Sequence, residues 1–153
     1  MSDTITLKHF CDLYVELDPI MELGTGRAGQ RRIIPIIGGE VRGERVNGRI
    51  LNLGADWQTV LADGTAELVA RYAFETADGA IIEIVNTGFR HGPPEVLAAI
   101  ARGEDVDPSL YYMRTQARLE TGDPRYAWVN TRLFIGSGSR QENGVKIALF
   151  EIC

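Results

Sequence analysis

The chain has 153 residues, of which 44% are hydrophobic and 24% are charged, and its net charge at neutral pH is -5. This profile is typical of one folded domain, residues 1–153, and not of a disordered tail. The acidic balance, without a basic stripe, argues against nucleic acid as a partner. No apolar run approaches the roughly 20 residues that span a bilayer, and residues 1–10 lack a signal-peptide pattern. We therefore expect a cytoplasmic protein with no membrane partner.

Cysteine and histidine are too few and too scattered to indicate a metal centre. Cys11 and Cys153 lie near opposite ends of the chain, without metal-type spacing or the density of a disulfide framework. His9 and His91 are the two histidines. No metal and no organic cofactor is expected.

Alternation of apolar and polar residues is the dominant pattern. Residues 5–17 alternate in this way, which predicts a strand with one buried face. Residues 18–32 contain Pro and several Gly and Arg residues, and they predict a long loop. Further strand-like runs cover residues 33–45, 46–53, 56–61, 66–76, 80–90, 111–120, 126–135 and 145–152.

One short helix is predicted over residues 93–105. Pro93 and Pro94 precede an apolar face formed by Val96 and Leu97, and Gly103 can end the helix. Many strands in sequence-adjacent pairs with one late helix indicate a mainly β fold, a single antiparallel meander closed into a β-barrel. A sandwich of two sheets is the competing architecture.

Two Asp-Gly pairs set the expected register of three strands. If residues 63–64 and 78–79 form the two-residue hairpin loops that this dipeptide favours, Asp56 lies opposite Arg71, and Arg71 lies opposite Asn86. Side chains opposed in this way are about 4.5–5.5 Å apart at Cβ, close enough to form hydrogen bonds. We call these three residues the predicted row. In this arrangement Arg71 lowers the pKa of Asp56, which suits a permanently ionised group.

Neighbouring residues divide between the two faces of this unit. Gln58 is expected beside the predicted row, whereas Trp57 points the other way because side chains alternate along a strand. The opposite face, expected to be core, holds Trp57, Leu68, Tyr72, Phe74, Val85 and Phe89. The predicted row itself has two interpretations: a solvated ion pair on the outside, or a polar row inside the barrel.

A third hairpin around residues 122–125 has an uncertain register, because its loop length is not fixed by the sequence. In either register Trp128 and Asn130 point the same way. Arg114 and Asn130 are therefore candidates to join the predicted row, where buried polar groups would need a network or a ligand.

Several strings in order resemble one protein family: RRIIPIIGGEVRGERVNGRIL, GADWQ, ARYAFETADGAIIEIVNTGFRHGP, YYMRTQARLETGDPRYAWVN and FIGSGSR. Together they resemble the bacterial UPF0311-like family of small β-barrels catalogued as a domain of unknown function, DUF 3237. The resemblance covers nearly the whole chain. Pro-Gly-Gly usually precedes Ala-Asp-Trp-Gln in that family, where this chain has Asn52, Leu53 and Gly54.

The resemblance implies a closed or nearly closed barrel with a cavity, and it moves the predicted row into the lumen. Asp56 and Arg71 are the candidate catalytic residues. The candidate binding residues are Trp57, Gln58, Tyr72, Asn86, Arg90, Arg114, Trp128 and Asn130.

Three functions stay open at this point. The first is a cofactor-independent isomerase, lyase or lactone hydrolase acting on a small organic acid or carbonyl compound, in which Asp56 serves as general acid or base. The second is a barrel that binds a small anionic or carbonyl-bearing ligand without changing it. The third is a structural protein that forms a homo-oligomer.

Two further motifs argue against other chemistry. Residues 23–29 (LGTGRAG) lack the following helix and Lys-Ser/Thr pair of a phosphate loop, and a plain surface loop or a mobile lid carrying Arg27, Arg31 and Arg32 is expected instead. Residues 136–139 (GSGS) predict a flexible turn, not the nucleophile of a serine-hydrolase triad.

Overall fold

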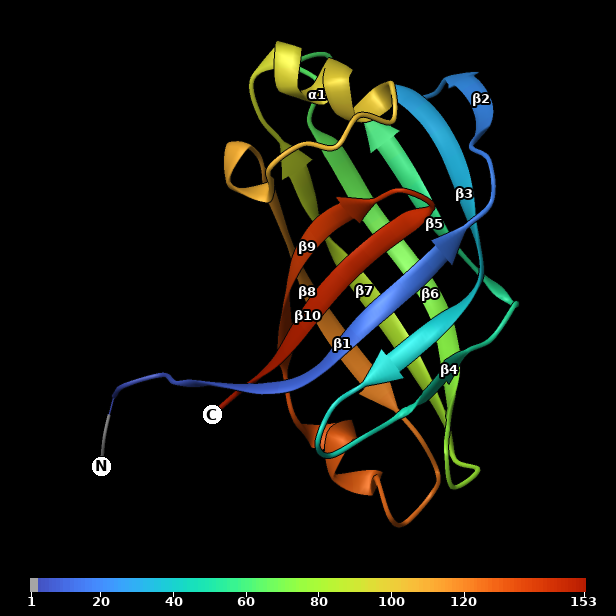
Figure 1. Ribbon diagram of the computed structural model, residues 1–153, viewed down its shortest axis with the longest axis vertical. Coiled ribbons are helices and arrows are strands. Elements are labelled where there is room, and N and C mark those ends of the chain that lie inside the picture. The colour runs from blue at the N-terminus through green and yellow to red at the C-terminus, as the bar shows by residue number, and fades with distance from the viewer. Residues whose placement is uncertain (1–2) are drawn as a thin grey trace.

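Long antiparallel strands account for most of residues 3–153, the part of the chain that the computed structural model describes (Figure 1). The strands are β1 (Leu7–Leu17), β2 (Met21–Thr25), β3 (Gln30–Arg42), β4 (Gly48–Ile50), β5 (Gly54–Val60), β6 (Ala66–Thr76), β7 (Ile81–His91), β8 (Tyr112–Glu120), β9 (Phe134–Gln141) and β10 (Gly144–Ile152). The helical elements are α1 (Pro94–Ala101), η1 (Pro108–Leu110) and η2 (Ala127–Thr131). None of the helices in residues 3–153 is long and apolar enough to cross a membrane.

The sheet closes on itself as a barrel. Successive strands from β6 to β10 pair in chain order, and β1 pairs with both β10 and β3. Along one edge β3 pairs with β1 and β2, and along its other edge it pairs with β4 and β5. Since β1 and β2 share one position round the barrel, and β4 and β5 share another, the ten strands form a closed eight-stranded barrel. Closure removes the unpaired edge that an open sheet would present. The prediction of an antiparallel barrel with one short helix is confirmed, and the sandwich is excluded.

Both Asp-Gly hairpins have three-residue loops, so the prediction of two-residue loops was wrong. In the first loop the amide of Leu61 donates to the carbonyl of Thr65 at 2.8 Å, and Gly64 has a φ of +90°. In the second the amide of Thr76 donates to the carbonyl of Ala80 at 2.8 Å, and Gly79 has a φ of +92°. A type I turn followed by a left-handed glycine is the usual three-residue hairpin loop. Each register therefore differs by one residue from the prediction.

Two segments depart from the expected strands and loops. Residues 18–32 contain β2 and the start of β3, joined by a tight turn in which the amide of Gly26 donates to the carbonyl of Gly29 at 2.7 Å. The prediction of a long loop over residues 18–32 was therefore wrong. The predicted strand over residues 126–135 is largely η2. Asn130 Oδ1 accepts a hydrogen bond from the amide of Thr121 at 2.8 Å, and Asn130 Nδ2 donates one to the carbonyl of Thr121 at 2.9 Å. These two bonds turn the chain back and replace the strand.

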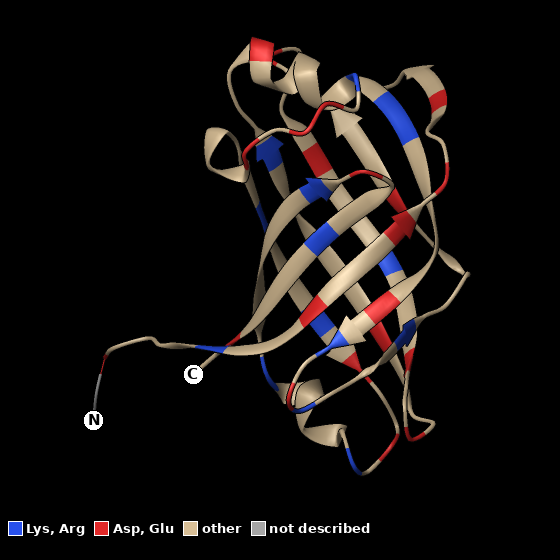
Figure 2. Cartoon of the chain, in the orientation of Figure 1, with Lys and Arg blue, Asp and Glu red and all other residues tan. Residues whose placement is uncertain are grey.

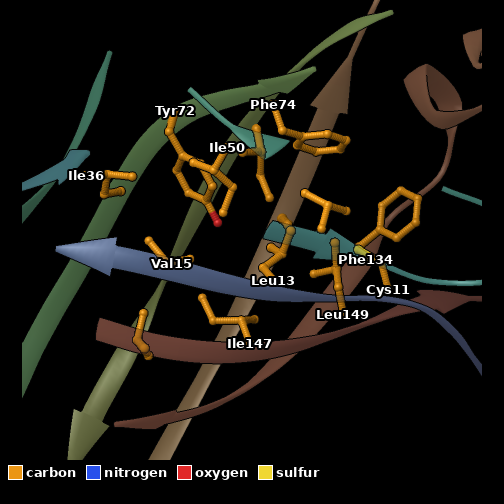
Figure 3. Close-up of a cluster of buried hydrophobic side chains, with 14 of the residues drawn as sticks. Cys11, Leu13, Val15, Ile36, Ile50, Tyr72, Phe74, Phe134, Ile147 and Leu149 are labelled. Atoms are coloured by element: carbon orange, nitrogen blue, oxygen red, sulfur yellow. The ribbon is translucent and has the colours of Figure 1, made fainter. Parts of the chain in front are cut away.

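The helix was predicted correctly, and it lies across one end of the barrel, whereas η2 lies at the other end (Figure 1). Gly103 has a φ of +78° and its amide donates to the carbonyl of Ile100 at 3.0 Å, which ends the helix as expected. Inside the barrel, inward residues of opposing strands form one apolar core (Figure 3). Its fully buried side chains include Phe10, Leu13, Phe74, Ile82, Ile84, Phe134 and Leu149.

Candidate functional site

The two register shifts keep Asp56 and Asn86 together but exchange the residue between them. Asp56 pairs with Ala70, and Ala70 pairs with Asn86, whereas Arg71 pairs with Ala55 and Val85. The row is therefore Asp56–Ala70–Asn86, and it faces the interior. The predicted row was wrong in its central member, because each loop contains one residue more than expected.

A small cavity lies beside this row in the barrel interior, with a volume of about 40 Å³. Since one buried water needs roughly 10–15 Å³ by this measure, the cavity holds about three water-sized groups. Its walls combine aliphatic side chains with a few polar ones. The lining residues are Val15, Leu17, Ile34, Ile36, Asp56, Gln58, Leu68, Ala70, Tyr72, Asn86, Arg90, Met113, Thr115, Arg140, Val145 and Ile147.

Asp56 is the carboxylate of the cavity. Its Oδ2 accepts a hydrogen bond from Gln58 Nε2 at 2.7 Å, and its Oδ1 accepts one from the amide of Val69 at 3.1 Å. Removal from water raises the pKa of Asp56, and these two hydrogen bonds and the more distant Arg90 and Arg32 only partly oppose the rise. The expectation of a lowered pKa was wrong, because Arg71 is not its neighbour. A carboxyl group with a raised pKa is better suited to proton transfer than a permanently ionised one.

Three arginines from separate strands lie in or beside the cavity wall. Arg90 on β7 and Arg140 on β9 line the cavity, and Arg32 on β3 donates from Nε to Gln58 Oε1 at 2.8 Å. Figure 2 shows that Lys and Arg occur at the ends of β3, β7 and β9 near α1. Burial lowers the pKa of Arg90 to about 10, and the positive charges of Arg32 and Arg140 contribute to this change. Burial also lowers the pKa of Arg140.

Three buried polar atoms of the cavity wall have no hydrogen-bond partner within residues 3–153. They are Tyr72 Oη, Asn86 Oδ1 and Thr115 Oγ1. Tyr72 and Asn86 are each 2% exposed, so bulk water does not compensate them. Burial raises the pKa of Tyr72, and its contact with the Asn86 side chain, which is too loose to count as a hydrogen bond, only partly opposes the rise. The hydroxyl therefore stays protonated and able to donate. Because a buried unpaired polar group is costly, a ligand that completes these hydrogen bonds would be favoured.

Five of the ten sequence-predicted site residues line the cavity, namely Asp56, Gln58, Tyr72, Asn86 and Arg90. Tyr72 had been expected on the opposite face, and it is inward because of the shifted register. The other five residues lie elsewhere.

Arg71, Trp57 and Arg114 are on the outer surface of the barrel. Arg71 forms an exposed ion pair with Glu83, with 2.8 Å between Nη2 and Oε1. Trp57 is 43% exposed, because it points away from the lumen between the inward residues Asp56 and Gln58. The predicted core face is therefore half right. Leu68, Tyr72 and Phe74 are buried in the core, whereas Trp57 and Phe89, which is 51% exposed, lie on the outside and Val85 is half-buried.

Trp128 and Asn130 lie at the opposite end of the barrel from the cavity, within or beside η2. Trp128 packs edge-on against Phe10, with ring centroids 5.5 Å apart, and Arg45 lies over its ring at 4.9 Å. Asn130 is occupied with the backbone of Thr121. Neither residue joins the inner polar row.

Sequence reasoning missed Arg140, Thr115 and Met113, and it placed Arg32 on a lid instead of beside the cavity wall. The signal for Arg140 is the alternation of Gly136, Gly138 and Arg140 along β9, which directs all three inward. A Cβ at Gly136 would lie 2.3 Å from Thr115 Oγ1, and one at Gly138 would lie 2.8 Å from Met113 Sδ. Both glycines thus leave room for the cavity residues of β8. The GSGS segment is a strand and not a flexible turn.

The remaining candidate residues, Arg27, Arg31, Cys11 and Cys153, do not line the cavity. Arg31 on β3 donates to Thr59 Oγ1 at 2.9 Å, and Arg27 is exposed in the short turn between β2 and β3. Cys11 and Cys153 are free thiols. Within residues 3–153 no cluster of His, Cys, Asp and Glu is arranged to hold a metal ion.

Comparison with known proteins decides the family. The model of the family described as "Protein of unknown function (DUF3237)" matches residues 5–152. The chain belongs to this family. The UPF0311 protein RPA1785 of Rhodopseudomonas palustris is 42% identical, with 99% of each chain covered. Its crystal structure superposes with a TM-score of 0.93 and 100% of both chains covered.

Two further solved structures share the barrel. A β-barrel-like protein of Acinetobacter baumannii AYE is 42% identical, with a TM-score of 0.88 over 100% of this chain and 99% of that one. A protein described as an enzyme from Penicillium herquei has a TM-score of 0.76 over 100% and 98% of the two chains. It is 18% identical, so its likeness to this DUF3237 member is one of fold.

Proposed function

We propose that this DUF3237 member binds a small organic acid or carbonyl compound in the barrel cavity and transfers a proton on it without a cofactor. The observation that carries the proposal is the placement of Asp56. This carboxylate has a raised pKa and lines the cavity of the barrel together with Arg90 and three unpaired polar atoms. Perturbed titratable groups in a cavity are typical of functional sites.

Each group has a chemical part in such a transfer. Asp56 removes a proton from a carbon next to a carbonyl group and returns it at the same or a neighbouring position, as in an isomerase. In a lyase Asp56 instead passes this proton to a hydroxyl group on the neighbouring carbon, which leaves as water while the C=C bond forms. Arg90 stabilises the negative charge that develops on the carbonyl oxygen. Tyr72 and Thr115 donate hydrogen bonds to substrate oxygens, and Asn86 Oδ1 accepts one from a substrate hydroxyl. Lactone opening needs, in addition, a water molecule that Asp56 activates.

The enzyme from Penicillium herquei supports the proposal only through its fold, because barrels of this shape host catalysis in at least one described case. The competing function is a barrel that holds its ligand unchanged. The three unpaired wall atoms favour the binding of a ligand, but they do not distinguish a ligand that reacts from one that is only bound.

Hydrogen exchange separates these functions without requiring the product to be known. We would incubate the protein in D₂O with pyruvate, lactate and 2-oxoglutarate and follow the loss of C–H signals by NMR. Thermal shift measures binding of the same compounds, because a ligand of the folded state stabilises it by mass action.

Asp56→Asn is the decisive variant, and Asp18→Asn is its matched control, since Asp18 is exposed. The proposal predicts exchange that Asp18→Asn retains and that Asp56→Asn reduces at least 100-fold, with binding retained. Binding without exchange in the unmodified protein would leave the non-catalytic barrel. Equal exchange in Asp56→Asn would remove Asp56 from the mechanism.

A further inference from the structure

The cavity has more positive than negative charge. One carboxylate, that of Asp56, faces the two guanidinium groups of Arg90 and Arg140, and Arg32 lies behind Gln58. Within residues 3–153, no carboxylate oxygen lies within 4.0 Å of a side-chain nitrogen of Arg90 or Arg140, although nine other pairs meet that criterion. Desolvated charges without partners are costly, so an anionic occupant would be strongly favoured.

The two unpaired arginines come from different strands. Arg90 is on β7 and Arg140 is on β9, with β8 between them. Neighbouring strands lie about 4.8 Å apart, so the backbones that carry the two arginines are roughly 10 Å apart. Arg90 lines only the inner cavity, whereas Arg140 lines this cavity and also borders a second hollow. The two guanidinium groups can therefore bind two separate carboxylates of one ligand.

We propose that the ligand of this site is a short dicarboxylic acid, one carboxylate of which lies in the cavity beside Arg90 while the second is held at its mouth by Arg140. The inference deepens the proposed function and depends on binding in the cavity, not on turnover. The volume of about 40 Å³ accommodates one carboxylate-sized group. The second carboxylate must therefore lie toward the α1 end.

The surroundings of Arg140 support its place at the mouth. It also borders a second hollow, which it shares with the acidic residues Glu104, Asp105 and Glu142. None of these carboxylates pairs with it within 4.0 Å, so its guanidinium remains available for a ligand. Their negative charge opposes any carboxylate at the mouth, so the attraction there must come from Arg140.

Calorimetric titration at constant ionic strength tests the inference with malonate and succinate as dicarboxylates, acetate as the monocarboxylate and inorganic phosphate as the compact dianion. Since a hydrogen-bonded charge pair contributes about 1.5–3 kcal/mol, malonate or succinate should bind at least tenfold more tightly than acetate. Arg140→Gln should lower dicarboxylate affinity at least tenfold and acetate affinity by a clearly smaller factor. Arg140→Lys, which keeps the charge but loses the bidentate geometry, should fall between them.

Arg118→Gln is the matched control, because Arg118 is exposed on the outer face of β8. It should leave every affinity unchanged. The inference is overturned if acetate binds as tightly as the dicarboxylates, if phosphate binds more tightly than both, or if Arg140→Gln weakens acetate and malonate equally. Dicarboxylate binding without hydrogen exchange on any keto acid would refute proton transfer alone. Exchange on monocarboxylates without a dicarboxylate preference would refute this inference alone.

Discussion

Replacing Ala62 by proline tests the three-residue loop that orients Asp56. In this loop Leu61 accepts a hydrogen bond from the amide of Gly64 at 2.9 Å, so Ala62 and Asp63 are the central residues of a type I turn. Neither has a positive φ. Proline is favoured at the first central position of a type I turn, because the φ of about -60° that this turn needs there matches the fixed φ of proline.

The magnitude follows from the conformational entropy of the unfolded chain. Proline at a compatible position stabilises by about 0.4–1 kcal/mol, and no hydrogen bond from the Ala62 amide is present among the turn bonds of residues 3–153. In a two-residue loop, by contrast, Ala62 would end the strand opposite Thr65 and its amide would belong to the ladder. Proline there would remove a ladder hydrogen bond and destabilise by about 1–3 kcal/mol.

Ala77→Pro is a matched control at the same position of the second hairpin. The amide of Ala77 donates to the carbonyl of Asn47 at 2.8 Å, so proline removes that bond. A hydrogen bond contributes about 0.5–1.5 kcal/mol, which offsets the entropic gain. Ala62→Pro should therefore be more stable than Ala77→Pro by roughly 1 kcal/mol. Urea unfolding curves with unchanged slopes measure the difference. A loss of several kcal/mol in Ala62→Pro would refute the assigned register.

Three further predictions concern the interior. Tyr72→Phe should stabilise the ligand-free protein by about 1 kcal/mol in urea unfolding, because it removes a buried hydroxyl without a partner; destabilisation would mean that the hydroxyl is satisfied. Arg45→Ala should destabilise by about 2 kcal/mol, since buried Glu151 loses its 2.8 Å ion pair and keeps only the 3.4 Å pair with Arg132, and an unchanged melting temperature would contradict this. At pH 8 iodoacetamide should modify exposed Cys153 and spare Cys11, whose pKa burial raises to about 12; mass spectrometry of peptides would show equal labelling if this is wrong.

The barrel could be predicted from the sequence because alternation and turn residues are local signals. The register could not, since Asp-Gly suits a two-residue loop and also the end of a three-residue one. Each hairpin register was predicted one residue out, so the predicted row has Arg71 in its middle where the structure has Ala70. The two shifts are opposite in sign for β5 relative to β7, so they cancel between these two strands. Asp56 and Asn86 consequently share a row in both the prediction and the structure.

Arg140 shows the limit of local reasoning about the site. Arg140 lines the cavity only because the sheet closes into a barrel, so that inward residues of β9 face the same interior as those of β3 and β7. Nothing in the Gly-Ser alternation of β9 reveals that neighbourhood. Trp128 and Asn130 were misplaced for a related reason, because a side-chain bond from Asn130 to the Thr121 backbone replaces the expected strand by η2.

The most direct test of the account is the titration of the Asp56 side-chain carboxyl carbon by ¹³C NMR, assigned with Asp56→Asn. Burial should raise its midpoint above the ordinary aspartate pKa of 3.8, and bound malonate should raise it further by placing negative charge nearby. Because the folded-state pKa exceeds the unfolded one, the stability that protonated Asp56 contributes should decline as the pH rises through that midpoint. A midpoint at or below 3.8, unmoved by malonate, would contradict a desolvated carboxylate in an anion-binding cavity.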